Sequence, residues 1–278
     1  MGISNQNTAL SIDFISVFGL HPVQFVALAA ELGCPHISIA LTPMPANPHG
    51  YPRWSLRDDR GLRQGTISAL KDDGVTISLG EGFLVRPGTE VRDSAADLDC
   101  MHELGVPTVN ILSLEPDASR ALEQLATFAD MAHARNMRAT LEFLPGLPIA
   151  DLASAVAAVR AVGRPNLQLL LDAMHVFRSG AQVADLAALD PALVGYAQLC
   201  DVPWVSKLAS YADEARYERL PPGEGELPLL DFVSVLPRDV VVGLEIPMLG
   251  QAERGIAPHD RLSGCVSSAR NLLARRRT

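Results

Sequence analysis

Four polar side chains in this chain each follow directly on a run of hydrophobic, β-type residues. They are Glu142, Asp172, Gln198 and Glu245, which come after TL, LLL, YA and VGL. Three carboxylates and one amide offer oxygen atoms only, and oxygen ligands suit Mn²⁺ or Mg²⁺ better than zinc. We therefore predict that these four residues are the ligands of one divalent metal ion. Mn²⁺ or Mg²⁺ is the expected ion, with Co²⁺ and Zn²⁺ left open.

The elements that must position these side chains follow a regular order, because short β-like runs alternate with helical segments along the whole chain. Eight strands alternating with eight helices predict an α/β fold of the (β/α)₈ TIM-barrel type. No G-x-G-x-x-G follows the first strand, which disfavours an open doubly wound sheet. We expect strands at 10–17, 36–41, 75–79, 108–114, 138–144, 167–172, 193–199 and 240–246, and helices at 22–32, 60–72, 91–104, 117–135, 149–162, 183–189, from 228 onward and at 259–275.

In a closed barrel, consecutive strands are neighbours, so the four predicted ligands on strands five to eight should converge at the C-terminal face. The two longest irregular segments, 42–59 and 201–227, also follow strands and should lie on that face, where active-site loops belong. A barrel of this type typically needs about 250 residues. We therefore expect residues 1–278 to form a single TIM-barrel domain.

Composition narrows the class of protein. Hydrophobic residues make up 48% of the chain, enough for a large buried core, and the formal net charge of −9 opposes a nucleic-acid surface. The four cysteines are scattered without a C-x-x-C pair, which is typical of a reduced cytosolic protein. Neither a signal peptide nor an apolar run of about 18 residues is visible. We expect a cytoplasmic enzyme with a small-molecule substrate and no nucleic-acid or membrane partner. A homo-oligomer stays open.

Several stretches resemble a known family: LEFLP, LLLDAMHVFRSG, YAQLCD, RLPPGEGELPL and GLEIP. They are similar to the xylose-isomerase-like barrel superfamily of sugar phosphate isomerases and epimerases, inosose dehydratases and 3-dehydroshikimate dehydratases, best over residues 138–248. The resemblance implies that one divalent metal is held by a Glu on strand five, an Asp on strand six, a His or Gln on strand seven and a Glu on strand eight. These positions match the four predicted ligands. Gln198 departs from the best-known sugar epimerases, which carry His there, and keeps the dehydratases in view.

The resemblance also implies two substrate-binding residues. His175 stands three residues after Asp172 in a D-x-x-H pattern, where the family places a substrate-contacting His. Arg219 precedes the PPGEG stretch, where the family often uses a basic residue, and a guanidinium can grip a carboxylate or a hydroxyl pair in bidentate fashion. The alternatives are a structural His that caps a turn and an exposed loop Arg. Glu81, after the third strand, could border the site.

A divalent ion flanked by carboxylates suits proton abstraction next to a carbonyl, with Glu142 or Glu245 as the catalytic base. Returning the proton gives isomerisation or epimerisation, and expelling a β-hydroxyl gives dehydration. The leading interpretation is a metal-dependent isomerase or epimerase of carbohydrate metabolism, acting on a sugar-like polyhydroxy keto compound. The alternative is a metal-dependent dehydratase (lyase) of the 3-dehydroshikimate or inosose type. An endonuclease-IV-like DNA repair enzyme is a third interpretation, opposed by the net charge and the lack of clustered His.

Overall fold

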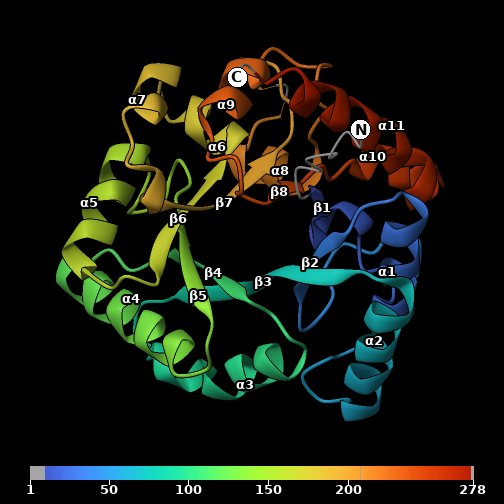
Figure 1. The fold of residues 1–278 in the computed structure, drawn as a ribbon, viewed down its shortest axis with the longest axis horizontal. Helices are drawn as coiled ribbons and strands as arrows, with labels where there is room; N and C mark the ends of the chain where they lie inside the picture. The colour runs from blue at the N-terminus through green and yellow to red at the C-terminus, as the bar shows by residue number, and fades with distance from the viewer. Residues whose placement is uncertain (1–9, 207, 277–278) are drawn as a thin grey trace, which may run out of the picture.

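Eight parallel strands close into one barrel in the computed structural model, which describes residues 10–206 and 208–276 (Figure 1). Each strand pairs with the next along the chain, and the last pairs with the first. The predicted (β/α)₈ fold is thereby confirmed. The strands are β1 (Leu10–Ile12), β2 (His36–Ala40), β3 (Thr76–Val85), β4 (Thr108–Ser113), β5 (Arg138–Glu142), β6 (Leu167–Asp172), β7 (Val194–Leu199) and β8 (Val242–Leu244).

Helices surround the barrel, and the longer ones form a ring outside it in Figure 1. Aspartates begin four of the helices: the side chains of Asp59, Asp117, Asp151 and Asp172 each accept a hydrogen bond from a backbone N–H in the first turn. The helices are α1 (Pro22–Glu31), α2 (Arg60–Asp73), α3 (Ala95–Glu103), α4 (Ala118–His133), α5 (Leu152–Val162), α6 (Ala173–Arg178), α7 (Val183–Ala187), α8 (Tyr211–Tyr217), α9 (Leu229–Val235), α10 (Leu249–Glu253) and α11 (Pro258–Ala274), with 3₁₀ turns η1 (Phe14–Val17), η2 (Val91–Ser94) and η3 (Pro191–Leu193).

The main hydrophobic core lies between the strands and the surrounding helices, and a second, small cluster lies inside the barrel. Leu79, Leu170 and Tyr196 form this inner cluster, although they come from β3, β6 and β7. The interior is also polar. The hydroxyl of Tyr196 lies 3.0 Å from Ser78 Oγ and donates to Asp13 Oδ1 at 3.4 Å. We call the linked residues Ser78, Tyr196, Asp13 and Gln198 the axial polar chain.

The prediction of a strand over 10–17 is wrong beyond residue 12. There the chain turns into η1, because Ser16 Oγ donates to the carbonyl oxygen of Leu244 and Phe18 adopts a left-handed φ of 47°. The segment 201–227 contains α8, which was not predicted, and α6 and α10 were missed as well.

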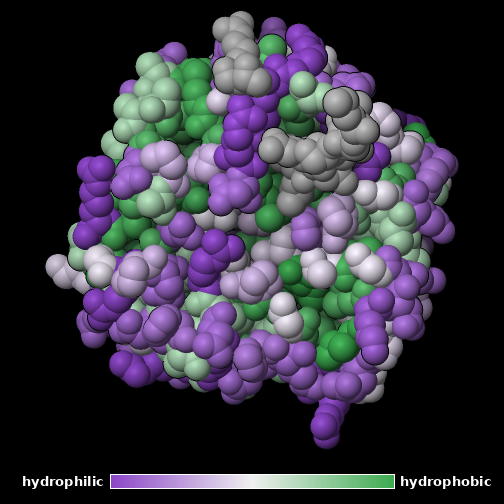
Figure 2. All heavy atoms as spheres, in the orientation of Figure 1, coloured by the Kyte–Doolittle hydropathy of each residue, from purple (hydrophilic) through white to green (hydrophobic). Residues whose placement is uncertain are grey.

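Hydrophilic side chains cover most of the face seen in Figure 2, and hydrophobic ones show between them. Among the described helices, none combines the length and the apolar composition needed to cross a bilayer.

Candidate active site

The four predicted metal ligands lie together at the C-terminal end of the barrel. Glu142 and Asp172 are the last residues of β5 and β6, Gln198 is the last but one of β7, and Glu245 follows β8. Asp172 pairs in register with Gln198, which pairs in turn with Gly243. All four side chains are buried, so the barrel brings them into one dry region.

His175 links two of these carboxylates. Its backbone N–H donates to Asp172 Oδ1 at 2.9 Å, so Asp172 caps α6, and its ring Nε2 lies 3.4 Å from Glu142 Oε1. The ring Nδ1 lies 2.6 Å from the hydroxyl of Tyr211 on α8. His175, the predicted substrate-binding residue, therefore lies beside the predicted ligands. Its backbone also forms part of the first turn of α6, which Asp172 caps.

Arg219 is buried, with an exposed fraction of 2%, so the alternative of an exposed loop arginine is wrong. Its Nη1 donates to Asp172 Oδ2 at 2.5 Å, and its Nε donates to the carbonyl oxygen of Ala215 at 2.7 Å. Nη2 lies 2.7 Å from Glu245 Oε2 and forms an ion pair with it. The N–H bonds do not point at this oxygen, so the contact is not a hydrogen bond. The guanidinium thus stands between two predicted metal ligands.

The amide of Gln198 has a fixed orientation and one unused oxygen. Its Nε2 donates to Asp13 Oδ2 at 2.9 Å and to Glu245 Oε1 at 3.2 Å, so the nitrogen must face the two carboxyls. Its Oε1 is buried and accepts no hydrogen bond from any described residue. A buried acceptor without a donor is costly, and a cation at this position would satisfy it.

The four side chains fit a hard divalent ion by their chemistry, since each supplies oxygen and one oxygen is unused. Within 10–206 and 208–276, no three His, Cys, Asp or Glu side chains are close enough to form a metal site by themselves. Arg219 holds Asp172 and Glu245 in the present arrangement. Metal binding by these residues stays a prediction.

Two further buried carboxyls, from the first half of the barrel, complete the region. Asp13 follows β1 and accepts from Gln198, and Glu81 lies within β3. Ser38 Oγ accepts from the backbone N–H of Phe14 at 2.9 Å and donates to Glu81 Oε1 at 2.5 Å. The serine proton is therefore directed at Glu81.

A family model described as "Xylose isomerase-like TIM barrel" matches residues 26–259. The chain belongs to this family. A search of curated proteins found no match.

Several solved structures have the same fold as this chain at low sequence identity. The IolI protein with a bound zinc atom has a TM-score of 0.80 at 15% identity, over 97% of this chain and 99% of its own. A probable 3-DHS dehydratase, AsbF of Bacillus anthracis, has a TM-score of 0.76 at 15% identity, over 94% and 98%. A D-psicose 3-epimerase has a TM-score of 0.67 at 16% identity, over 95% and 99%. The titles of the last two structures name enzymes of different reaction types, a dehydratase and an epimerase.

Burial and charge divide the carboxyls of the candidate site into two groups. Burial raises the pKa of Asp13 to about 7. The charges of Asp172 and Glu142 also raise this pKa, whereas hydrogen bonds from Gln198 and Tyr196 lower it. Burial likewise raises the pKa of Glu81 and of Glu245 well above the usual range, with neighbouring carboxylates adding to both shifts.

Asp172 behaves in the opposite way. Burial also acts to raise its pKa, but the charges of Arg219 and His175 outweigh this, so that the pKa lies below its ordinary value. The region therefore combines an ionised carboxylate with carboxyls that retain a proton more readily.

Several site residues were missed by sequence reasoning. Asn110 Nδ2 donates to Glu142 Oε2 at 2.6 Å, and its own Oδ1 accepts from Thr140 at 3.0 Å. Arg219 Nη1 also donates to the Sγ of Cys200 at 3.4 Å, and burial holds that thiol's pKa well above its usual range. The available signal was a lone polar residue within a hydrophobic run, as in TVNIL for Asn110 and SIDF for Asp13.

Proposed function

We propose that the protein is a divalent-metal-dependent isomerase or epimerase that acts on a sugar-like polyhydroxy keto compound. The observation that carries the proposal is the pair of buried carboxyls, Glu142 at the end of β5 and Glu245 directly after β8, in one connected site. Glu142 joins His175, and Glu245 joins Arg219 and Gln198. Family membership supports an enzyme of this kind, and D-psicose 3-epimerase is among the structures with a similar fold.

Glu142, Asp172, Gln198 and Glu245 would hold the metal. When bound, a divalent cation would polarise a substrate carbonyl and lower the cost of removing the neighbouring proton. Around that position Asn110 orients Glu142 through a hydrogen bond of 2.6 Å. Arg219 orients Asp172 through a hydrogen bond of 2.5 Å.

The two glutamates would exchange the proton. One carboxylate would take up the hydrogen next to the carbonyl, and a second carboxyl would deliver its own proton to another carbon or to the opposite face. Burial raises the pKa of Glu245, whereas the pKa of Asp172 lies below its ordinary value, so of these two carboxyls Glu245 accepts a proton more readily when no metal is bound. Which glutamate acts as the base in a given direction depends on the substrate.

His175 and Arg219 would bind substrate oxygens. His175 is buried and held by Tyr211, so its ring is positioned before the substrate arrives. Arg219 carries several N–H groups on a planar fork that suits a carboxylate or a pair of hydroxyls.

A dehydratase of the 3-dehydroshikimate or inosose type is the second candidate, and one observation favours it. Expulsion of a hydroxyl as water needs a nearby proton donor, and burial raises the pKa of Glu81 well above the usual range. Glu81 and the amide at Gln198 are the features by which this chain would serve that reaction.

Turnover of the Mn²⁺-loaded protein in D₂O, against a panel of keto-sugars, inososes and dehydroshikimate, tests the proposal. We expect an isomer or epimer that carries deuterium next to the carbonyl, read by NMR. Loss of water, read as absorbance of a conjugated product, would assign the dehydratase instead. An abasic DNA duplex in the same panel tests the endonuclease interpretation.

Glu142→Gln and Glu245→Gln test the role of the two carboxyls. The variant of the true base should lose about 10²- to 10⁴-fold in kcat. It should keep much of its metal, since an amide oxygen can still coordinate. Near-wild-type turnover of both variants with metal bound would show that no glutamate of this pair is the base.

A further inference from the structure

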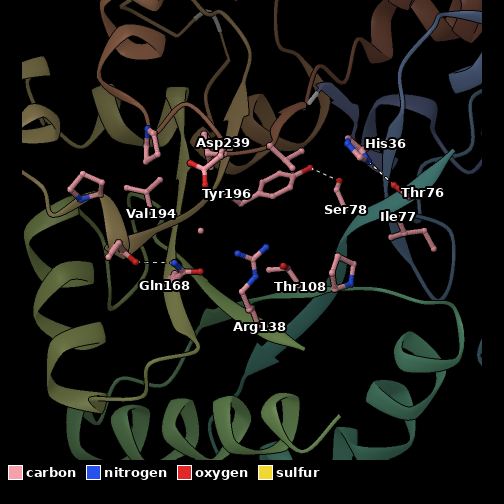
Figure 3. A pocket seen from close by; sticks show the side chains of 17 residues that line it. His36, Thr76, Ile77, Ser78, Thr108, Arg138, Gln168, Val194, Tyr196 and Asp239 are labelled. Atoms are coloured by element: carbon pink, nitrogen blue, oxygen red, sulfur yellow. Dashed lines mark hydrogen bonds between the residues drawn. The ribbon is translucent and has the colours of Figure 1, made fainter. Parts of the chain in front are cut away.

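A cavity of about 290 Å³ opens at the N-terminal mouth of the barrel, the end opposite the candidate active site (Figure 3). Its wall includes the first residues of β2, β3, β4 and β5, together with parts of β6 and β7 and the segment before β8. Small-molecule sites typically have about 300–1,000 Å³, so the cavity suits a compact ligand. The polar residues on its wall are His36, Thr76, Ser78, Thr108, Arg138, Gln168, Tyr196 and Asp239.

Two opposite charges face this cavity. Arg138 and Asp239 line it, and Figure 3 shows the guanidinium and the carboxylate entering from opposite sides of the view. Neither side chain makes a hydrogen bond or an ion pair of 4.0 Å or less with any described residue. His36 is engaged by Thr76 Oγ1 at 2.7 Å, and burial lowers its pKa, so it adds no charge near neutral pH. The cavity thus has one cation and one anion available.

An acceptor oxygen is held beside these charges. The Nε2 of Gln168 donates to the carbonyl oxygen of Ala192 at 2.8 Å, which fixes the amide, and its Oε1 is buried without a partner among the described residues. In Figure 3 the amide extends toward the middle of the cavity. A Cβ at Gly195 would lie 2.9 Å from this oxygen and 2.8 Å from Gln168 Cβ, so glycine there leaves room for the amide.

We propose that the N-terminal mouth binds a small zwitterion of the α-amino-acid class. The ligand carboxylate would lie on the guanidinium fork of Arg138, and its ammonium would donate to Asp239 and to Gln168 Oε1. A simple anion would leave Asp239 unpaired, and a simple cation would leave Arg138 unpaired. Binding at this site does not require the metal, so the test of this proposal is separate from the test of the proposed function.

An NMR titration of the ¹⁵N-labelled full chain tests the proposal, with glycine, acetate and methylammonium as three probes. Glycine should shift the side-chain amide signals of Gln168 and the Nε–H signal of Arg138, and should bind at least tenfold more tightly than either single-charge probe. Arg138→Gln and Asp239→Asn should each weaken glycine binding by about tenfold or more, the loss of one charge-assisted contact. Arg160→Gln, an exposed arginine on α5, should leave it unchanged.

Gly195→Ala adds a third variant, which should displace the Gln168 amide and weaken glycine binding while both charges remain. Thermal unfolding of each variant verifies that it is folded. If acetate binds as well as glycine and Asp239→Asn has no effect, the cavity is an anion site and the zwitterion assignment is wrong. Absence of glycine-dependent shifts at these residues, or shifts that the Arg138 and Asp239 variants leave unchanged, would also overturn it.

Discussion

At the residue scale, Asp172 has three tasks. It caps α6 through the N–H of His175, it pairs with the buried guanidinium of Arg219, and it is a predicted metal ligand. Its place at the end of β6 and its candidacy as a ligand could be read from LLLD. The cap is local, since it joins Asp172 to the N–H three residues on. The ion pair with Arg219 could not be read from the sequence, because it depends on the path of the 201–227 segment back to the barrel.

Asp172→Asn should therefore change both metal content and stability. The amide can still cap α6, but one of three anionic ligands is lost and Arg219 keeps only Glu245 as a charged partner. We expect a sharp loss of Mn²⁺ by elemental analysis, and a fall of about 3–5 kcal/mol in the free energy of unfolding of the metal-free protein in urea. Asp130→Asn, which breaks the exposed pair with Arg164, should cost no more than about 1 kcal/mol. Equal Mn²⁺ content in wild type and Asp172→Asn would contradict the ligand assignment.

Asp13 should make stability depend on pH. Burial raises its pKa from 3.8 to about 7, so the folded protein favours the protonated form. The contribution is fully present below the unfolded pKa of 3.8 and is lost as the pH rises through about 7. Asp13→Asn removes this loss, so its free energy of unfolding relative to wild type should increase between pH 4 and pH 8, by on the order of 4 kcal/mol.

Urea unfolding at a series of pH values with a chelator present measures the effect of Asp13. Asp231→Asn, an exposed position on α9, serves as the control and should track the wild type. Parallel pH profiles of wild type and Asp13→Asn would show that Asp13 does not titrate in this way.

At the scale of the elements, β8 passes close to Asp13. A Cβ on Gly243 would lie 2.4 Å from Asp13 Oδ2, and the neighbouring strand places Gln198 beside it. Gly243→Ala should therefore destabilise the protein by about 1–3 kcal/mol, the usual cost of overpacking, and should weaken Mn²⁺ binding by shifting Asp13 and Gln198. Denaturant unfolding and metal analysis measure both.

Gly264 offers a matched control for that substitution. It lies in the interior of α11, is exposed, and has nothing within 4 Å of an added Cβ. Gly264→Ala should stabilise by about 0.5–1 kcal/mol, because alanine is the better helix former. A Gly243→Ala variant as stable as wild type would show that the strand tolerates the added carbon.

Most of the longer elements could be predicted from sequence because their apolar period extends over several turns or a whole strand. The strand predicted at 75–79 is an exception, since β3 continues to Val85. Residues 167–172 match β6 at both ends, and 60–72 differs from α2 by one residue. The short helices α6, α8 and α10 span five to seven residues, too few for a period to show. A local cap by Asp172 holds α6, and tertiary contacts such as the bridge between Asp201 and Leu220 hold the segment around α8.

The candidate site was only partly predictable for a similar reason. Its second-half residues follow strands in a repeated pattern, whereas Asp13 and Asn110 are single polar residues in or directly after strands of the first half. Asp13 accepts a hydrogen bond from Gln198 and Asn110 donates one to Glu142, and these contacts cannot be read from one sequence without the closed sheet.

At the scale of the whole molecule, the barrel mouth carries an excess of buried acid. Asp13, Glu81, Glu142, Asp172 and Glu245 are all buried there, beside the guanidinium of Arg219. Addition of Mn²⁺ to chelator-treated protein should therefore raise the Tm, by an amount that grows with the logarithm of metal concentration above Kd. Differential scanning calorimetry measures the change, with Asp172→Asn as the comparison. A Tm that Mn²⁺ does not alter would count against Mn²⁺ binding at this mouth.

The axial polar chain has a consequence for anyone who would redesign this barrel. In this fold the bottom face is commonly treated as a stabilising module and the top face as an interchangeable catalytic one. Here Ser78, which lines the lower cavity, connects through Tyr196 and Asp13 to Gln198, a predicted ligand. The two modules share one set of hydrogen bonds, so a new lower half cannot be grafted beneath the existing upper half without re-engineering the residues between them.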